Sequence, residues 1–323
     1  MSPRRTHSSR LPAPFFRPNR QRPTGARNDA VRPRKELGQH FLVDANVLER
    51  IAAEAELEPN QSVLEVGAGT GELTAALAAV GARIAAVELD ETLCRGLRSR
   101  FDSNPAVRVV NANILDHEPH ELLFEAGLTP PYVVVANIPY YITAPILRHL
   151  LEAHTPPRRL VLTLQREVAE SIAAPPGAFS LLAISVQFYA TAMLLFRLPA
   201  TAFRPPPKVE SAVLRIDVSA SPHIQVEDRD AFFEIVRAGF RSPRKQLHNA
   251  LSRGIWMPPG EAEPLLRGAG IDPLRRAQTL SLNEWKAIYD AYRARRIGWG
   301  AIAEAPTSPD DVAIGPHPSG EDE

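Results

Sequence analysis

The chain has 323 residues, and its acidic and basic side chains balance to a formal net charge of zero. No apolar run is long enough to cross a bilayer, and the single cysteine, Cys94, excludes an internal disulfide framework and a multi-thiolate metal site. We therefore expect a cytoplasmic protein with no membrane partner and no metal, whose length suits two domains.

The two ends of the chain differ in charge and lack the periodicity of helices or strands. Residues 1–33 are rich in arginine and proline with Asp29 as their one acid, whereas residues 298–323 finish in Glu321-Asp322-Glu323. Segments of this composition bury too little apolar surface to fold. We predict a disordered basic tail over residues 1–33, which has no apolar segment of the kind a secretory signal needs, and a disordered acidic tail over residues 298–323.

The ordered chain is predicted to begin near residue 34, with a short loop that leads into a helix over residues 45–55. Asp44 suits the N-cap of that helix. In the loop, Gln39 and His40 stand beside Phe41 and Leu42. These polar side chains either line the edge of a ligand pocket or belong to a packed loop.

A glycine-rich loop follows an apolar strand over residues 62–66 and opens a helix through residue 79. Gly67, Gly69 and Gly71 alternate, which lets backbone approach a ligand without Cβ clashes near the free N–H groups of a helix start. The spacing differs from the dinucleotide fingerprint Gly-x-Gly-x-x-Gly, and this disfavours a nicotinamide oxidoreductase. Such a loop can instead surround the amino-acid end of S-adenosylmethionine.

Two polar residues follow the next two predicted strands. Glu88 ends the strand over residues 83–87, about twenty residues beyond the glycines, where a carboxylate can accept hydrogen bonds from both ribose hydroxyls. A helix over residues 91–101 and a strand over residues 107–110 precede Asn113. Asn113 either accepts the adenine amine of a cofactor or is a turn residue.

The β-branched run at residues 132–135 predicts a buried parallel strand, and Asn137-Ile138-Pro139-Tyr140 follows it. Pro139 fixes φ and donates no hydrogen bond, so this motif starts a helix poorly. It is suited to aim one amide side chain and one aromatic ring into a crevice, although a plain strand-to-helix turn would look similar.

Further elements complete the predicted sheet. Thr143 is expected to cap a helix over residues 144–153, followed by a strand at 160–164, helices at 165–174 and 180–187, and strands at 190–196 and 212–218. A proline-rich loop over residues 203–211 connects the last two strands. Its prolines fix an extended shape that either carries Phe203 or Lys208 over the site or serves as a rigid connector.

Strands that alternate with helices predict a mostly parallel, doubly wound α/β sheet over about residues 45–218. The ligand crevice of such a sheet lies at the carboxyl ends of its strands, where Gly67, Glu88, Asn113 and Asn137 all fall. Residues 228–296 are predicted to be helical. On the second helix of this region, Arg241, Arg244, Lys245 and His248 recur at helical spacing, and they form either a basic binding face or a solvated one.

With these motifs in place, the chain resembles the small-subunit ribosomal RNA adenine dimethyltransferase family over about residues 34–292. The glycine loop is shared by many methyltransferases, whereas the proline-rich loop and the motifs of the helical region are specific to this family. The resemblance rests on the segments at residues 37–42, 65–74, 137–140, 165–169, 203–211, 240–247 and 278–281. It implies a Rossmann-like S-adenosylmethionine-dependent methyltransferase domain over residues 34–220 and a small all-α RNA-binding domain over residues 226–297.

The resemblance also implies roles for particular residues. The positions that match cofactor contacts are His40, Leu42, Gly67, Glu88, Asn113 and Asn137. The catalytic motif is Asn137, Ile138, Pro139 and Tyr140, and the residues expected to meet RNA are Tyr140, Phe203, Arg241, Arg244 and Lys245. Two positions depart from the family pattern, because Asn113 stands where Asp is usual and His40 stands where Asn is frequent.

The function implied is transfer of methyl groups from S-adenosyl-L-methionine to N6 of two adjacent adenines near the 3′ end of small-subunit (16S) ribosomal RNA, by a monomer. Tyr140 is expected to stack on the target base and Phe203 to close its other face. The basic tail either helps to hold RNA phosphates or has no function. The alternatives are a resistance-type methyltransferase of large-subunit ribosomal RNA and a ribosome-assembly factor without catalysis.

Overall fold

A computed structural model of the chain describes residues 40–299. The predicted basic tail and nearly all of the acidic one lie outside the described residues. The strands are β1 (Phe41–Leu42), β2 (Ser62–Val66), β3 (Arg83–Glu88), β4 (Val107–Asn111), β5 (Tyr132–Asn137), β6 (Arg159–Gln165), β7 (Ala190–Leu198), β8 (Phe203–Arg204) and β9 (Ser211–Val218). The α-helices are α1 (Ala45–Glu54), α2 (Glu72–Ala79), α3 (Glu91–Arg100), α4 (Pro119–Glu125), α5 (Thr143–Leu151), α6 (Arg166–Ile172), α7 (Leu181–Gln187), α8 (Arg229–Phe240), α9 (Leu247–Gly254), α10 (Ala262–Gly268) and α11 (Leu282–Trp299).

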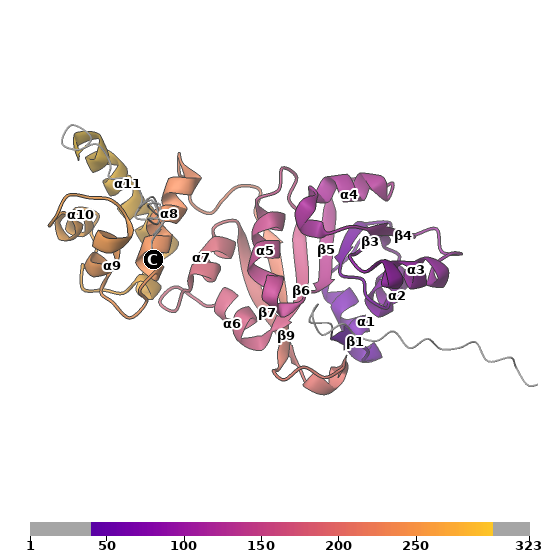
Figure 1. Cartoon of the computed structure of the whole chain (residues 1–323). Coiled ribbons are helices and arrows are strands. Elements are labelled where there is room, and N and C mark those ends of the chain that lie inside the picture. Colours follow the sequence, from indigo (N-terminus) through magenta and orange to yellow (C-terminus); the bar gives the residue numbers. More distant parts are fainter. Residues whose placement is uncertain (1–39, 300–323) are drawn as a thin grey trace, which may run out of the picture. The chain divides into compact units, whose positions relative to one another are not determined.

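Seven strands form one sheet in the order β4-β3-β2-β5-β6-β9-β7 (Figure 1). Neighbouring strands from β4 through β6 pair in parallel, and β9 runs antiparallel to both β6 and β7. The mostly parallel sheet predicted from the sequence is therefore confirmed. In register, Val66 of β2 pairs with Val87 of β3 and with Ala136 of β5, so the carboxyl ends of β2, β3 and β5 share one edge of the sheet.

Alternate residues of the strands pack against helices on opposite faces of this sheet. Val63, Val133 and Val135 belong to a hydrophobic cluster with residues of α1, α2 and α3. Leu64 and Val134 belong to a second cluster with residues of α4, α5, α6 and α7. Burial on both faces explains why these strands have near-continuous apolar sequences, as parallel strands usually do.

Polar side chains cap the N-termini of four helices. The side chains of Asp44, Asp90, Ser180 and Asp228 accept hydrogen bonds from backbone N–H groups at the starts of α1, α3, α7 and α8. The cap predicted at Thr143 is wrong. Thr143 is the first residue of α5, and its hydroxyl donates to the carbonyl of Tyr140 at 3.2 Å. Helix α4 was not predicted.

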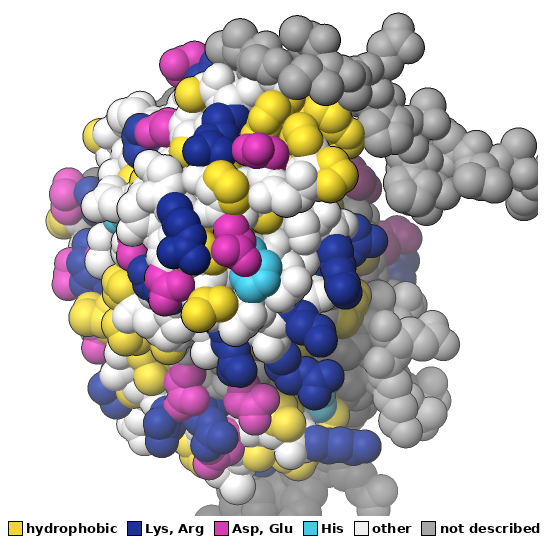
Figure 2. Space-filling view, turned by 90° about the vertical axis from the view of Figure 1, so that its left-hand side faces the viewer, with side chains coloured by type: hydrophobic (Ala, Val, Ile, Leu, Met, Phe, Trp, Pro, Cys, Tyr) yellow, Lys and Arg dark blue, Asp and Glu magenta, His cyan; other side chains and the backbone are white. Residues whose placement is uncertain are grey.

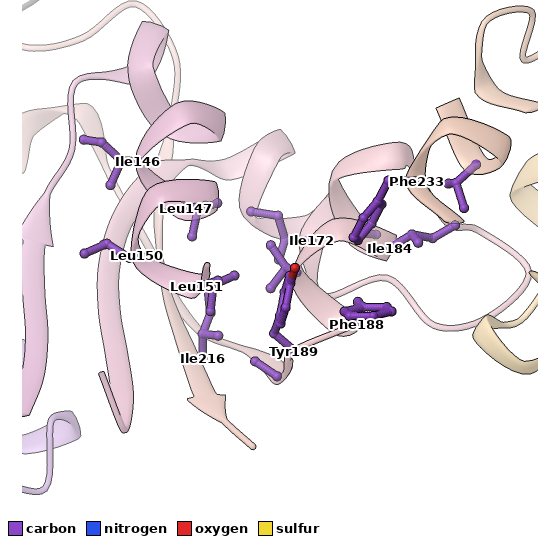
Figure 3. Close-up of a cluster of buried hydrophobic side chains, with 14 of the residues drawn as sticks. Ile146, Leu147, Leu150, Leu151, Ile172, Ile184, Phe188, Tyr189, Ile216 and Phe233 are labelled. Carbon is purple, nitrogen blue, oxygen red and sulfur yellow. The ribbon is translucent and has the colours of Figure 1, made fainter. Parts of the chain in front are cut away.

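The helical region, α8 to α11, shares its core with the sheet. Phe188 and Tyr189 at the end of α7 contact Phe232 and Phe233 of α8, with the Phe188 ring centroid 5.4 and 5.1 Å from those of Phe232 and Phe233. Figure 3 shows Tyr189 between Leu151 of α5 and the rings of Phe188 and Phe233. One hydrophobic cluster thus continues from the sheet into the helices, and the domain boundary expected between residues 220 and 226 stays a prediction.

The basic stripe expected on one helix is not helical. Arg241, Arg244 and Lys245 lie in the turn between α8 and α9, and of the predicted stripe only His248 is in α9. Pro243 explains the difference, because its ring lacks an N–H and disfavours helical conformation at the residue before it. All three cationic side chains are exposed.

Within residues 40–299, no helix combines the length and apolar character needed to cross a bilayer.

Candidate active site

A cavity opens at the carboxyl ends of β2, β3 and β5. The residues that line it are His40, Phe41, Val66, Gly67, Gly69, Val87, Glu88, Leu89, Ala112, Asn113, Ile114, Asn137, Ile138, Pro139, Tyr140, Tyr141, Ile142 and Ile146. The convergence of Gly67, Glu88, Asn113 and Asn137 that the order of elements predicted is present.

The glycine loop forms one wall of the cavity and is held against the neighbouring strand. The backbone N–H groups of Gly67 and Ala68 donate to the carbonyl of Val87 at 2.8 and 3.2 Å. Gly69 has a positive φ of 59°, and a Cβ at this position would lie 3.1 Å from the Phe41 ring. The loop therefore needs glycine here both for its conformation and for close packing on Phe41.

Glu88 is buried behind the loop, and its carboxylate is fixed by two backbone donors. The N–H of Gly69 donates to one oxygen at 2.8 Å, and the N–H of Asp90 donates to the other at 2.9 Å. A carboxylate has about four acceptor positions, so these bonds leave acceptor capacity on a residue that also lines the cavity.

A second carboxyl group, Glu65, lies beside the loop and is 1% exposed. One of its oxygens accepts from the Thr74 hydroxyl at 2.6 Å, and the other, Oε1, has no partner within the described residues. Burial raises the pKa of Glu65 to about 8, and the nearby negative charge of Glu88 acts in the same direction. With Gly67, Gly69 and Asn137, Glu65 lines a smaller pocket that adjoins the cavity.

The position of Asn113 is compatible with both roles that the sequence left open. It lines the cavity, and it also caps the short 3₁₀ helix η2 (Ile114–Asp116), because its Oδ1 accepts from the N–H of Leu115 at 3.2 Å. Its Nδ2 donates to Asp116 at 3.0 Å, which fixes the orientation of the amide. The oxygen keeps one lone pair for a ligand.

Asn137 ends β5 with its side-chain amide anchored on one side. Nδ2 donates to the backbone carbonyl of His40 at 2.8 Å, and within residues 40–299 no group donates to Oδ1. The backbone N–H of the next residue, Ile138, donates to Thr163 at 3.3 Å, and Pro139 keeps φ near −56°. The chain turns away from the sheet here, and an acceptor oxygen remains at the cavity.

Tyr140 is held at both its hydroxyl and its ring. The hydroxyl is hydrogen-bonded to Ser211 at 2.6 Å, and burial raises the pKa of the phenol, which keeps it protonated. The imidazole of His40 lies near-parallel to the ring at 22°, with 6.2 Å between centroids. The His40 Nδ1–H donates to the carbonyl of Pro205 at 2.7 Å, which connects the proline-rich loop to the same group.

The structure places two of the expected site residues elsewhere. Phe203 is 2% exposed, packs in the hydrophobic cluster of α1 to α3, and does not line the cavity. It pairs with Leu42 across the small β1–β8 sheet, so the expectation that Phe203 closes one face of a target base does not fit this position and is corrected. Leu42 is also buried, and it lines the smaller pocket rather than the cavity. Arg241, Arg244 and Lys245 are not part of the cavity.

Phe41, Leu89 and Tyr141 are among the residues at the cavity that were not predicted as site residues. Phe41 covers the glycine loop, and Leu89 and Tyr141 line the cavity while remaining 54% and 61% exposed. Each directly follows a predicted site residue, and that adjacency is the signal by which the sequence could have identified them.

The comparisons with known proteins agree with this geometry. A family model described as "Ribosomal RNA adenine dimethylase" matches residues 30–293. The protein named "Ribosomal RNA small subunit methyltransferase A" from Dehalococcoides mccartyi (strain CBDB1) is 43% identical over 80% of this chain and 88% of its own length. Its namesake from Moorella thermoacetica (strain ATCC 39073 / JCM 9320) is 40% identical over 81% of this chain and 93% of its own length.

Solved structures show the same fold. The 23S rRNA methyltransferase ErmE aligns with a TM-score of 0.61 and 29% identity over 78% of this chain and 98% of that one. A dimethyladenosine transferase from Plasmodium falciparum aligns with a TM-score of 0.66 and 22% identity over 80% of this chain and 98% of that one.

The parallel sheet, the glycine loop and the Asn-Ile-Pro-Tyr motif at the end of β5 define a methyltransferase of the S-adenosylmethionine-dependent class. The chain belongs to the ribosomal RNA adenine dimethylase family, which confirms the family, the fold class and the enzyme class predicted from the sequence.

Proposed function

We propose that the chain transfers methyl groups from S-adenosyl-L-methionine to N6 of two adjacent adenines near the 3′ end of small-subunit (16S) ribosomal RNA, during biogenesis of that subunit. The observation that carries this proposal is the Asn137 side chain, whose Nδ2 is bound to His40 and whose Oδ1 is left at the cavity. The identity of 43% to a small-subunit enzyme, against 29% to ErmE, favours the small-subunit target.

The residues at the cavity fit this cofactor. Gly67 and Gly69 allow backbone to approach its amino-acid part, and the buried carboxyl of Glu65 has an oxygen without a partner beside them. Glu88 has acceptor capacity for the two ribose hydroxyls, and Asn113 has a lone pair for the adenine amine. When bound, S-adenosylmethionine supplies an electrophilic methyl group on a sulfonium sulfur.

Asn137 and Ile138 act on the nitrogen that receives the methyl group. The exocyclic amine of adenine is a poor nucleophile because its lone pair is conjugated with the ring. Hydrogen bonds from its N–H groups to Asn137 Oδ1 and to the Ile138 carbonyl favour a more tetrahedral nitrogen, at about 1 kcal/mol net each. Alignment of the amine contributes more, up to about 7–11 kcal/mol, which makes a rigidly held Asn137 essential.

The target adenine leaves its stack to enter the cavity, and Tyr140 provides a surface for it. Stacking of a base on an aromatic ring is worth about 1–3 kcal/mol, which offsets part of the cost of unstacking. The bond from Tyr140 to the fully buried Ser211 fixes the ring before the base arrives.

The exposed turn between α8 and α9 is the proposed contact for RNA phosphates. None of the ion pairs within residues 40–299 involves Arg241, Arg244 or Lys245, so their charges are available. Figure 2 looks onto the helical region and shows Lys and Arg side chains gathered on one side of it. Unpaired surface cations of this kind are typical of sequence-independent phosphate contacts.

The test is methyl transfer from labelled S-adenosylmethionine to undermethylated small ribosomal subunits, with large subunits alongside and the RNA digested to nucleosides. Label in dimethyladenosine from small subunits alone is the expected result. Label in large-subunit RNA would show that the enzyme methylates that RNA instead. Cofactor binding without label in either RNA would identify an assembly factor that lacks catalysis.

A further inference from the structure

The glycine loop is held from outside the cavity by a side chain at the end of α3. Arg100, the last residue of that helix, donates from Nη1 to the backbone carbonyl of Thr70 at 2.7 Å. The same guanidinium donates to both carboxylate oxygens of Glu72, from Nη1 at 2.7 Å and from Nη2 at 3.0 Å. One side chain thus connects the glycine loop and the first residue of α2 to α3.

The contact between Arg100 and Glu72 differs from an ordinary surface ion pair. Exposed pairs that meet through a single donor contribute little, because solvent screens them and both side chains lose freedom. A guanidinium that meets both oxygens of a carboxylate is fixed in orientation as well as attracted. The third bond, to the carbonyl of Thr70, transfers that fixed orientation to the backbone of the glycine loop.

Apolar side chains pack against the loop from the same helix. A Cβ at Gly71 would lie 2.7 Å from Leu97 and 2.8 Å from Phe101, so these two side chains already fill the space beside the loop. The guanidinium carbon of Arg100 lies 5.4 Å from the centroid of the Phe101 ring. Polar bonds and close packing therefore act together to fix the loop against α3.

The two residues that Arg100 holds belong to the smaller pocket beside the cavity. Thr70 and Glu72 line that pocket together with Gly67 and Gly69, whereas Arg100 lines neither the pocket nor the cavity. The proposed function puts the amino-acid part of the cofactor at the glycine loop. That part carries a carboxylate, which an unpaired Glu72 would repel.

We propose that Arg100 is a positioning residue for the amino-acid part of S-adenosylmethionine. It fixes the carbonyl of Thr70 and neutralises Glu72, and it thereby holds the glycine loop in the shape that receives this part of the cofactor. The inference rests on the proposed function, which makes S-adenosylmethionine the cofactor. Arg100 acts through the loop and has no contact of its own with the cofactor or the RNA.

Two variants and two ligands separate this role from a general effect on the fold. Arg100→Met removes all three hydrogen bonds and keeps an unbranched apolar stem. Arg95→Met is the matched control, because the contacts of Arg95 are with Glu91 and Thr92 of its own helix. S-adenosylhomocysteine contains the amino-acid part, and 5′-methylthioadenosine lacks it.

The experiment measures the Kd of each ligand by calorimetry, and the melting temperature without ligand, for the wild type and both variants. If Arg100 positions the loop, Arg100→Met raises the Kd for S-adenosylhomocysteine by about tenfold and changes that for 5′-methylthioadenosine by less than about twofold. In Arg95→Met, both Kd values stay within about twofold of the wild type.

Two results would overturn the proposal. Equal weakening of both ligands in Arg100→Met would show that Arg100 supports the whole site and not the amino-acid part. Unchanged affinity for S-adenosylhomocysteine would show that the loop keeps its shape without these bonds. Failure of the proposed function is distinguishable from both, because a wild-type protein that binds the cofactor would then leave small-subunit RNA unlabelled.

Discussion

The side-chain amide of Asn137 donates to the backbone carbonyl of His40 at 2.8 Å and so joins residues 97 positions apart. A carbonyl oxygen can only accept, so the nitrogen of the amide must face His40, and Oδ1 is the atom that remains for a ligand. The orientation of the catalytic amide is therefore set by the segment that precedes β1. This contact is the reason that a residue near the start of the described chain belongs to a site at the end of β5.

Replacement of Asn137 by alanine should lower turnover by about 100-fold or more while the Kd for S-adenosylmethionine changes little. The reason is that Oδ1 acts on the amine of the target base, whereas the side chains proposed to accept hydrogen bonds from the cofactor are those of Glu88 and Asn113. Labelled methyl transfer and calorimetry measure the two quantities. Asn46→Ala, an exposed change in α1, is the control. Near-normal turnover in Asn137→Ala would remove this residue from the mechanism.

Glu88→Gln should weaken cofactor binding by about tenfold or more and also lower the melting temperature. Two backbone N–H groups donate to the two carboxylate oxygens, so an amide at this position turns one acceptor into a donor that faces another donor. Calorimetry with the cofactor and thermal unfolding without it measure the two effects. Glu91→Gln, on the exposed first turn of α3, is the matched control. Unchanged affinity would exclude Glu88 from the cofactor site.

Much of the fold was predictable because its signals are local. The β-branched runs and the glycine loop located β2, β3 and β5, and parallel pairing then placed Gly67, Glu88 and Asn137 at one edge of the sheet. The order of the strands and the antiparallel β9 depend on long-range pairing, which no local pattern contains.

The errors have identifiable physical causes. Helical spacing suggested a stripe from Arg241 to His248, but Pro243 ends the helix and moves the cations into a turn. Phe203 was placed at the base because its loop is rigid, yet pairing of β8 with β1 buries the ring. His40 and Asn137 are 97 positions apart in the sequence, and neither residue type indicates that the two are in contact.

Gly71→Ala should destabilise the protein more than Gly81→Ala. Both glycines have φ of 84°, so the backbone penalty for alanine, about 1–2 kcal/mol, is shared. At Gly71 a Cβ would lie 2.7 Å from Leu97 and 2.8 Å from Phe101, while at Gly81 nothing lies within 4 Å. Overpacking should add about 1–3 kcal/mol at Gly71. Denaturant unfolding of both variants measures the difference, and equal losses would show that the glycine loop adjusts freely.

Because the pKa of Glu65 is raised, we expect the protein to become less stable as pH rises from about 4.5 to 8. The pKa of Glu65 is about 8 in the folded protein against an ordinary value of 4.5, so between these values the folded state binds a proton that the unfolded state has lost. The contribution of Glu65 to the free energy of unfolding is therefore fully present below about pH 4.5 and is lost as pH rises toward 8. Over this range the free energy of unfolding falls by up to about 1.4 kcal/mol per pH unit. Glu65→Gln stays uncharged and should lack this slope. Unfolding of both proteins from pH 5 to 8 is the measurement, and parallel curves would contradict the prediction.

Charge reversal at Arg244 and Lys245 should weaken binding to small subunits and reduce its dependence on salt. Each cation that contacts a phosphate releases about one counterion, so removal of both should lower the slope of log K against log salt by about two. Binding is measured at several salt concentrations, with Arg95→Glu on the exposed face of α3 as the control for charge alone. Because neither residue lines the cavity, cofactor affinity should not change. A double variant with the salt slope of the control would show that this turn does not contact RNA.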